Sequence, residues 1–170
     1  LVVSDRHVEA VRFRMLETVR EFAEEQLAAR ERCRLRQRHG RYWLALAEGV
    51  DAEIDASGAS GALWVDRYER DVENLRVALR WWIEEREGFS PSEGLRLAAA
   101  LQWFWHVRCH WKEGEEWLQR ALAHADAGVL SENEDHSAVR AYALSGAGEL
   151  AELRCDYRRA RSFQEEALAI

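Results

Sequence analysis

The chain has 170 residues, of which 48% are hydrophobic and 32% charged, and it contains one proline. This balance is typical of a helix-rich globular protein and excludes a disordered chain, and no apolar run approaches the about 18 residues that a membrane span needs. The formal net charge of −7 argues against a protein whose whole surface grips the phosphate backbone of a nucleic acid.

The cysteines and the first residues bear on where the protein works. Cys33, Cys109 and Cys155 form an odd, sparse set without a CxxC motif, which suits a reducing cytoplasm better than a disulfide framework. The chain opens on Leu1 without a basic-then-apolar leader. We therefore expect a cytoplasmic protein, and the missing initial methionine suggests that this chain is part of a longer one.

The first 27 residues differ in pattern from the rest. Leu1–Val3 and Val11–Leu16 have β-type character and flank the polar segment Ser4–Glu9, which predicts a two-stranded hairpin with a medium-length loop. A lone hairpin is marginal in water, so it needs cover from the next helix or from preceding sequence. A helix is predicted from Glu17, with an apolar face formed by Leu16, Val19, Phe22, Ala23 and Leu27.

An arginine-rich segment follows this helix. If it is helical, its arginines spread around much of the surface, which favours a solvated or partner-facing helix and leaves nucleic-acid contact as the alternative. The preceding helix could run on through this segment, and Gly40 is a candidate break. The six arginines are Arg30, Arg32, Arg34, Arg36, Arg38 and Arg41.

The middle of the chain predicts a loop, a helix and a second loop. Ala56–Gly61 (ASGASG) is the clearest loop, Leu63–Glu87 carries a helical apolar stripe, and Gly88–Glu93 ends it. Ser92 is a candidate N-cap for the next helix.

The tryptophan-rich stretch Leu95–Leu122 predicts two helices joined by a tight turn near Arg108–Trp111. A helix this apolar needs helical neighbours on both sides. The remaining predicted elements are a helix over Lys112–His124, a polar loop over Asp126–Ser137, and helices over Ala138–Leu153 and Tyr157–Ile170.

An internal repeat links this stretch to the C-terminal helices. Cys109 aligns with Cys155 at a spacing of 46 residues, and the aligned pairs that share the spacing are Trp111 with Tyr157, Gly114 with Ala160, Ala121 with Ala167, and Leu122 with Leu168. Repeated helix pairs are typical of an α-solenoid. The second unit resembles a tetratricopeptide repeat in Gly148, Ala160 and Ala167, although Gln164 stands where that family has a large aromatic residue.

A wider resemblance covers nearly the whole chain. Its residues are Phe13–Leu27 (FRMLETVREFAEEQL), Glu73–Arg76 (ENLR), Ala78–Trp81, and Phe104–Arg108 with Glu113, Gly114, Trp117 and Leu118. Together they resemble the middle of bacterial STAND-type signalling ATPases, the MalT-like and AfsR-like transcriptional regulators. That family usually has a glycine in the turn after Trp105, where this chain has Cys109.

The resemblance implies the end of a winged-helix domain over residues 1–29 and a tetratricopeptide-like helical repeat domain over residues 30–170. The expected fold is mainly α: an α-solenoid of antiparallel helix pairs with a short N-terminal β-hairpin. The expected function is the non-catalytic sensor and linker region of a STAND-type regulatory ATPase. Such a region would bind an inducer, a partner protein or its own nucleotide-binding domain, and it could take part in self-assembly. The sequence has no GxxxxGK[ST] phosphate loop, so we expect no enzymatic activity and no cofactor.

Two other classes stay open at this point. One is a free-standing helical-repeat adaptor that binds proteins, which the sequence encoded before Leu1 would distinguish. The other is a DNA-binding module that uses the hairpin as a wing and the arginine segment as a clamp. Because the charge is acidic overall, we expect no specific nucleic-acid binding, and the short apolar runs predict no membrane association.

Two candidate chemical sites are weak. His106, Cys109 and His110 have near metal-ligand spacing and Cys155 could approach them, but matching small residues in two turns explain the cysteines better. Glu113, Glu115 and Glu116, or Glu149 and Glu152, could be paired acid–base carboxylates, but no nucleophile accompanies them. We therefore predict exposed helix faces for these acids and no catalytic or metal-binding residues.

The inner surface of the helix pairs is the stronger candidate, because solenoids bind peptides and proteins there. The repeat places Arg96, Ala99, Trp103 and His106 on it in one unit, and Tyr142, Ser145, Glu149 and Glu152 in the next. Tryptophan, tyrosine and arginine are common at binding hot spots. The alternative is that Trp103 packs inward. The predicted partner-binding residues are Arg96, Trp103, His106, Tyr142, Glu149 and Glu152.

Overall fold

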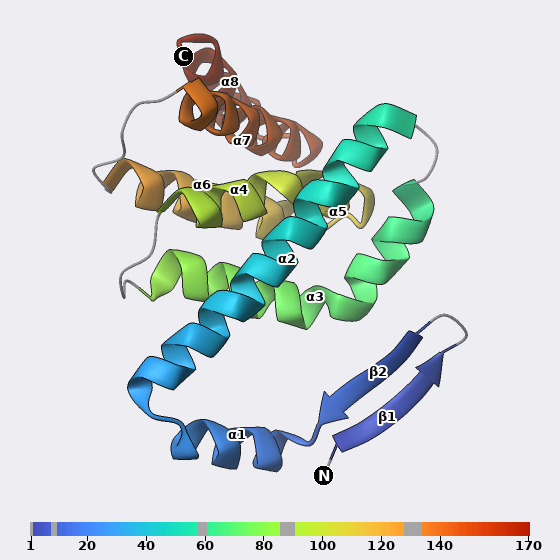
Figure 1. Cartoon of the computed structure of the whole chain (residues 1–170). Helices are drawn as coiled ribbons and strands as arrows, with labels where there is room; N and C mark the ends of the chain where they lie inside the picture. The colour runs from blue at the N-terminus through green and yellow to red at the C-terminus, as the bar shows by residue number, and fades with distance from the viewer. Residues whose placement is uncertain (1, 8–9, 58–60, 86–90, 128–133) are drawn as a thin grey trace. The chain divides into compact units, whose positions relative to one another are not determined.

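The computed structural model describes residues 2–7, 10–57, 61–85, 91–127 and 134–170. This part of the chain is mainly α-helical, as the sequence predicts (Figure 1). The chain divides into two compact units, Leu1–Arg38 and His39–Ile170, which are described separately below. The elements are β1 (Val2–His7), β2 (Ala10–Met15), α1 (Glu17–Gln26), α2 (Ala29–Ser57), α3 (Gly61–Glu84), α4 (Pro91–Ala100), α5 (Gln102–Val107), α6 (Trp111–Ala127), α7 (Glu134–Leu153) and α8 (Tyr157–Leu168).

In the first unit, β1 and β2 pair antiparallel, with Val2 opposite Met15 and His7 opposite Ala10. The medium-length loop predicted over Ser4–Glu9 is wrong for residues 4–7, which belong to β1. Each of these residues has a partner in β2, so the backbone pairing continues although the side chains are polar. Residues 8 and 9 lie outside the described part of the chain.

The helix that begins at Glu17 does not run on through the arginine segment. α1 ends at Gln26, Leu27 has an extended backbone (φ −79°, ψ 131°), and α2 begins at Ala29. The Arg32 guanidinium donates hydrogen bonds to the carbonyl oxygens of Glu24, at 2.9 Å, and Leu27, at 3.4 Å. An arginine of the segment thus adds hydrogen bonds to carbonyl groups at the end of α1, where the regular helical pattern stops.

The arginines of this segment fall into two groups by exposure. Arg30, Arg34 and Arg38 are exposed and, at spacings of four residues, lie on one side of α2. Arg32 and Arg36 are half-buried. Arg41, the sixth arginine, is also exposed. Arg30, Arg34 and Arg38 thus form a short basic row within the wider spread of arginines that the sequence predicts.

In the second unit, α2 is uninterrupted at Gly40, so the predicted break is wrong. Gly40 is buried, and a Cβ at this position would lie 2.7 Å from Cε2 of Trp82 and closer still to its Nε1. The glycine therefore allows the indole of α3 to approach the backbone of α2, and it does not end a helix.

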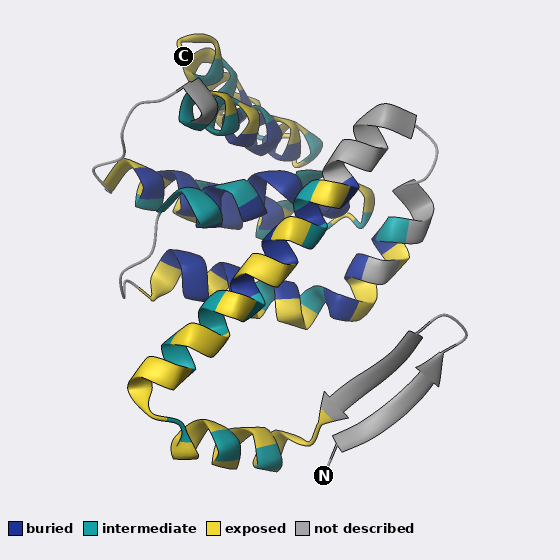
Figure 2. Ribbon diagram, viewed as in Figure 1, coloured by how far each residue is buried: buried dark blue, intermediate teal, exposed yellow. Residues whose placement is uncertain are grey.

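The core of the second unit lies between helices from distant parts of the sequence. Figure 2 shows the buried residues on the facing sides of α3, α4, α6 and α7. Leu75, Leu79 and Trp82 of α3 are almost completely buried, and Leu95 and Leu97 of α4 are fully buried. Burial of the large apolar surface of these residues makes the main contribution to the stability of this unit.

The start of α4 differs from the prediction. Pro91 is its first residue, a position where a missing N–H costs nothing and the fixed φ suits the helix. Ser92 lies within the first turn, so its predicted N-cap role is wrong. The helix predicted before the tight turn is also divided, because α4 ends at Ala100 and α5 begins at Gln102, after Leu101.

Two tight turns join α5 to α6 and α7 to α8. Cys109 (φ 59°) and Cys155 (φ 60°) are the residues of the described chain, glycine aside, with positive φ. His110 N–H donates to Trp105 C=O at 3.0 Å, and Asp156 N–H donates to Ala151 C=O at 2.9 Å. Both are Schellman motifs, in which a left-handed residue ends a helix. The 46-residue repeat that aligns the two cysteines therefore also holds for the backbone.

Each turn leads into a closely packed helix pair, and α7 and α8 run side by side (Figure 1). In the first pair a Cβ at Gly114 would lie 2.7 Å from Trp105, so the glycine makes room for the indole. The equivalent positions in the second pair are Ala151 and Ala160, both buried. The first pair thus combines a tryptophan with a glycine, and the second pair has an alanine at each of the two positions.

The polar loop predicted over Asp126–Ser137 is shorter than expected. α6 continues to Ala127 and α7 begins at Glu134, while residues 128–133 lie outside the described part. Across the ranges that the structure describes, none of the helices has the length and apolar character to cross a membrane.

The close approach of Trp82 predicts a contrast between two glycines of α2. Gly40→Ala should destabilise the protein by about 1–3 kcal/mol, because its methyl group overlaps the indole. Gly49→Ala should stabilise it by about 0.5–1 kcal/mol, because nothing lies within 4 Å and alanine is the better helix former. Urea unfolding of both variants measures the difference. Equal shifts in the same direction would contradict the packing role of Gly40.

The left-handed turns predict that glycine is favoured over cysteine there. Cys109→Gly and Cys155→Gly should each raise the free energy of unfolding by about 0.5–1 kcal/mol, because the steric cost of a Cβ at positive φ disappears. Cys33→Gly is the control: Cys33 lies in helix α2, so glycine should cost about 1 kcal/mol there. Destabilisation in all three variants would show that the turns tolerate cysteine without strain.

Candidate partner-binding hollow

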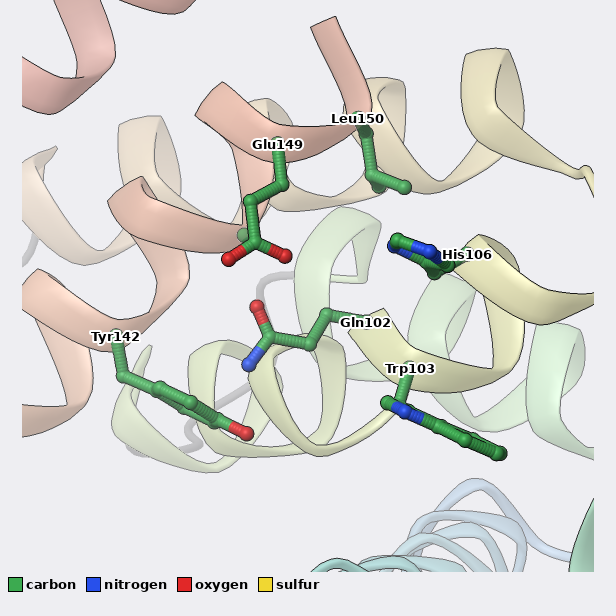
Figure 3. Close-up of a pocket in the computed structure, with 7 residues that line it drawn as sticks. Gln102, Trp103, His106, Tyr142, Glu149 and Leu150 are labelled. Carbon is green, nitrogen blue, oxygen red and sulfur yellow. The ribbon is translucent and has the colours of Figure 1, made fainter. Parts of the chain in front are cut away.

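A hollow of about 200 Å³ lies between α5 and α7. Figure 3 shows its side chains: the Glu149 carboxylate and the Gln102 amide point toward one another, and the Tyr142 ring lies beside Gln102. The lining residues are Gln102, Trp103 and His106 of α5 and Tyr142, Gly146, Glu149 and Leu150 of α7.

The hollow brings together four of the six residues predicted to bind a partner. Trp103, His106, Tyr142 and Glu149 all line it. The repeat could place them because it indicates which face of each first helix points inward. His106, Tyr142 and Glu149 are exposed, whereas Trp103 is partly buried and packs against the core. Trp103 therefore has both a packing role and a place in the lining.

Arg96 and Glu152 are not in the lining. The Arg96 guanidinium donates two hydrogen bonds to Glu48 of α2, Nε to Oε1 at 2.6 Å and Nη2 to Oε2 at 2.8 Å. This bidentate geometry is the strongest form of ion pair between side chains. Arg96 therefore ties α4 to α2, and its predicted role in partner binding is not visible in the hollow.

Sequence reasoning missed Gln102, Gly146 and Leu150. A Cβ at Gly146 would lie 2.8 Å from Cδ of Gln102 and closer still to its Oε1, so the glycine makes room for this amide. The signal was present, because a glycine inside a helix is costly and often marks a close approach. The identity of the approaching side chain could not be read from the sequence.

The sequence predicts that Glu113, Glu115 and Glu116 of α6 are exposed, but the structure buries one of them. Glu115 is 1% exposed and pairs with Arg154 and with Arg159, whose Nη2 lies 2.9 Å from its Oε1. Gln119 Nε2 also donates to Glu115 at 2.9 Å. This buried carboxylate therefore links α6 to the turn before α8. The exposed-face prediction holds for Glu116 alone of the three α6 acids, because Glu113 is half-buried.

Glu113 pairs with Arg76 of α3 through two hydrogen bonds of 2.7 Å. These bonds hold the pKa of the Glu113 carboxyl below its usual value of 4.5, although burial acts in the opposite direction. Arg76 also contacts Glu73, its neighbour on α3. The ion pair therefore joins α3 to α6 on the outside of the core.

The last three residues of the ENLR segment, Glu73–Arg76, each have a structural role. Asn74 forms a side-chain hydrogen bond with His39, Leu75 is buried, and Arg76 holds Glu113. Burial lowers the pKa of His39 below 6.5, so this imidazole is neutral at pH 7 and accepts a 2.9 Å hydrogen bond from Trp43 Nε1. This segment thus connects α3 to both α2 and α6.

A metal site is not formed by the histidines and cysteines near the turns. Within the described ranges, no three metal-ligating side chains come together. Cys109 and Cys155 are both exposed and occupy the two left-handed turn positions. Their near-ligand spacing in the sequence thus reflects the repeated turn.

Comparison with known proteins finds similarity to regulators of transcription. The chain is 35% identical over 145 residues to proteins of Mycobacterium tuberculosis (strain H37Rv) and Mycobacterium bovis, each named "Putative HTH-type transcriptional regulator". The matched region is 85% of this chain and 15% of each relative, so the chain spans only a small part of their length. No family model and no solved structure matches.

The Arg76–Glu113 pair predicts a pH-dependent contribution to stability. The folded-state pKa of Glu113 is lowered, so the contribution is present above about pH 4.5 and is lost as the pH falls through the folded pKa. Glu113→Gln should cost about 1 kcal/mol at pH 7 and progressively less below pH 4.5.

Unfolding free energies at pH 7, 5 and 3.5 test this, with Glu116→Gln as the exposed control on the same helix. A cost for Glu113→Gln that stays constant over this range would show that the carboxylate charge does not stabilise the fold.

Proposed function

We propose that this chain is the non-catalytic sensor and linker region of a STAND-type regulatory ATPase. Its helix pairs would form the start of a tetratricopeptide-like solenoid, and residues 1–29 the end of a winged-helix domain. The hollow between α5 and α7 would receive an inducer, a peptide of a partner protein or a segment of the nucleotide-binding domain. Binding there would shift the whole protein between an inactive and an assembled state.

The observation that carries this proposal is the alignment of 85% of the chain with a small part of long proteins named transcriptional regulators. A region of that kind is a module within a regulator and needs no chemistry of its own. The two Schellman turns 46 residues apart support the helical-repeat part of the proposal, because repeated turns recur in stacked helix pairs.

A ligand can only act as an inducer if it binds the two states with different affinity. In the proposed mechanism this difference would come from the two walls of the hollow, which belong to different helix pairs: α5 is joined to α6, and α7 is joined to α8. A ligand that contacts both walls would favour one relative position of the pairs. The free-standing adaptor is the alternative, and in it the same hollow would bind a protein without any ATPase to regulate.

The regulatory proposal predicts that changes in the hollow alter the output of the full-length protein that contains this chain. The measured quantity is the rate of ATP hydrolysis with inducer divided by the rate without it. The double variant Trp103→Ala, His106→Ala should change this ratio by about tenfold, which is within the usual range of coupling between sites. The control is Arg161→Ala with Glu165→Ala, two exposed residues of α8 outside the hollow.

The purified 170-residue chain alone should release no phosphate from ATP. Hydrolysis by this chain would contradict its non-catalytic assignment. If the Trp103→Ala, His106→Ala variant has the same ratio as the unaltered protein and the same unfolding midpoint as the control, the hollow has no part in regulation. Absence of any nucleotide-dependent output in the full-length protein would favour the adaptor.

A further inference from the structure

Glu149 carries a negative charge at the edge of the hollow that no basic side chain neutralises within the described chain. This distinguishes it from other glutamates at helix contacts. Glu48 pairs with Arg96, Glu113 with Arg76, and Glu115 with Arg154 and Arg159. An acid that is left without such a partner at a hollow is available to a cation from outside.

The other walls of the hollow also favour a cation. Trp103 and Tyr142 contribute aromatic rings, whose faces attract ammonium and guanidinium groups. Gln102 contributes an amide oxygen that can accept a hydrogen bond, and Figure 3 shows this amide facing the Glu149 carboxylate. Both α5 and α7 therefore contribute an acceptor and an aromatic ring to the lining.

The size of the hollow limits what fits. Sites for drug-sized ligands measure about 300–1,000 Å³, whereas this hollow measures about 200 Å³. This volume suits one charged group with a short aliphatic stem. A whole peptide or a nucleotide would have to remain mostly outside.

Other ligand classes fit less well. An anion would meet the Glu149 carboxylate, and the lining offers it the His106 imidazole but no lysine or arginine. A divalent metal ion needs several ligands, and no cluster of three such groups occurs in the described ranges. A purely apolar ligand would bury the Gln102 amide and the Glu149 carboxylate without partners, which is costly.

We infer that the hollow between α5 and α7 binds an organic cation, a guanidinium or ammonium group. Glu149 is its counter-ion, Gln102 accepts a hydrogen bond from it, and Trp103 and Tyr142 flank it. The inference rests on the proposed sensor role, for which it defines the class of ligand. The cation belongs either to a small free amine or to an arginine or lysine side chain of a partner protein, and the chemistry of recognition is the same.

Nuclear magnetic resonance titration of the ¹⁵N-labelled chain tests this directly. The probe is ethylguanidinium chloride, and ethylurea is the neutral control of similar shape. The indole N–H signal of Trp103, assigned with Trp103→Phe, should shift with the cation at concentrations about tenfold lower than with ethylurea. Glu149→Gln should weaken cation binding about tenfold, because it removes the charge and keeps the shape. Glu165→Gln, an equal loss of charge on the exposed side of α8, should leave it within about twofold.

The source of the cation is resolved with two capped tripeptides, Gly-Arg-Gly and its citrulline counterpart. Preference for the arginine peptide over free ethylguanidinium indicates a protein partner, and the reverse indicates a small amine. The inference would be overturned if ethylurea or a neutral sugar bound as tightly as ethylguanidinium. It would also be overturned if Glu149→Gln bound the cation as tightly as the unaltered chain. If the chain binds no cation while the Trp103 and His106 variant of the full-length protein still loses its response, the cation inference fails and the sensor role stands.

Discussion

Two left-handed turns determine how the second unit is built. At Cys109 and again at Cys155 the backbone reverses with positive φ, and hydrogen bonds from His110 and Asp156 close the turns. Because each reversal takes only three residues, the helices on its two sides must pack closely next to the turn. That packing accounts for the small residues near the turns, with Gly114 under Trp105 as the clearest case. The 46-residue repeat in the sequence is therefore a repeat of a backbone constraint, to which the side chains have adapted.

Between the helix pairs, apolar packing is accompanied by ion pairs with defined geometry. Arg96 joins α4 to α2, Arg76 joins α3 to α6, and Glu115 of α6 is buried against two arginines of the last pair. Burial of a charged pair contributes little net stability, because desolvation offsets most of the attraction. Breaking one is costly, however, since it leaves a charge without a partner. These contacts therefore act mainly on the register of neighbouring helices.

The sequence was most informative where local chemistry decides the structure. The apolar periodicity located most of the helices, and the aligned cysteines located both turns. It was least informative where the local structure is determined by a side chain from another part of the sequence. Gly40 looked like a helix break because nothing nearby in the sequence shows that Trp82 packs against it. The division at Leu101 carries no glycine or proline, and the Leu27 carbonyl, just after the end of α1 at Gln26, accepts a hydrogen bond from a guanidinium five residues further on. In the hollow, the repeat identified Trp103, His106, Tyr142 and Glu149, but Gln102 required the structure.

The division at Leu101 also matters for function. α5 is a separate six-residue helix, attached to α6 by a tight turn and preceded by Leu101, where α4 has already ended. Gln102, the first residue of α5, packs against Gly146 of α7, and this contact forms one wall of the hollow. A ligand between Gln102 and Glu149 would therefore contact this short helix on one side and the long helix α7 on the other. Phe104 and Trp105 of α5 are buried in the core and fix this helix, so in the proposed sensor role a ligand here would act on the contact between the two helix pairs.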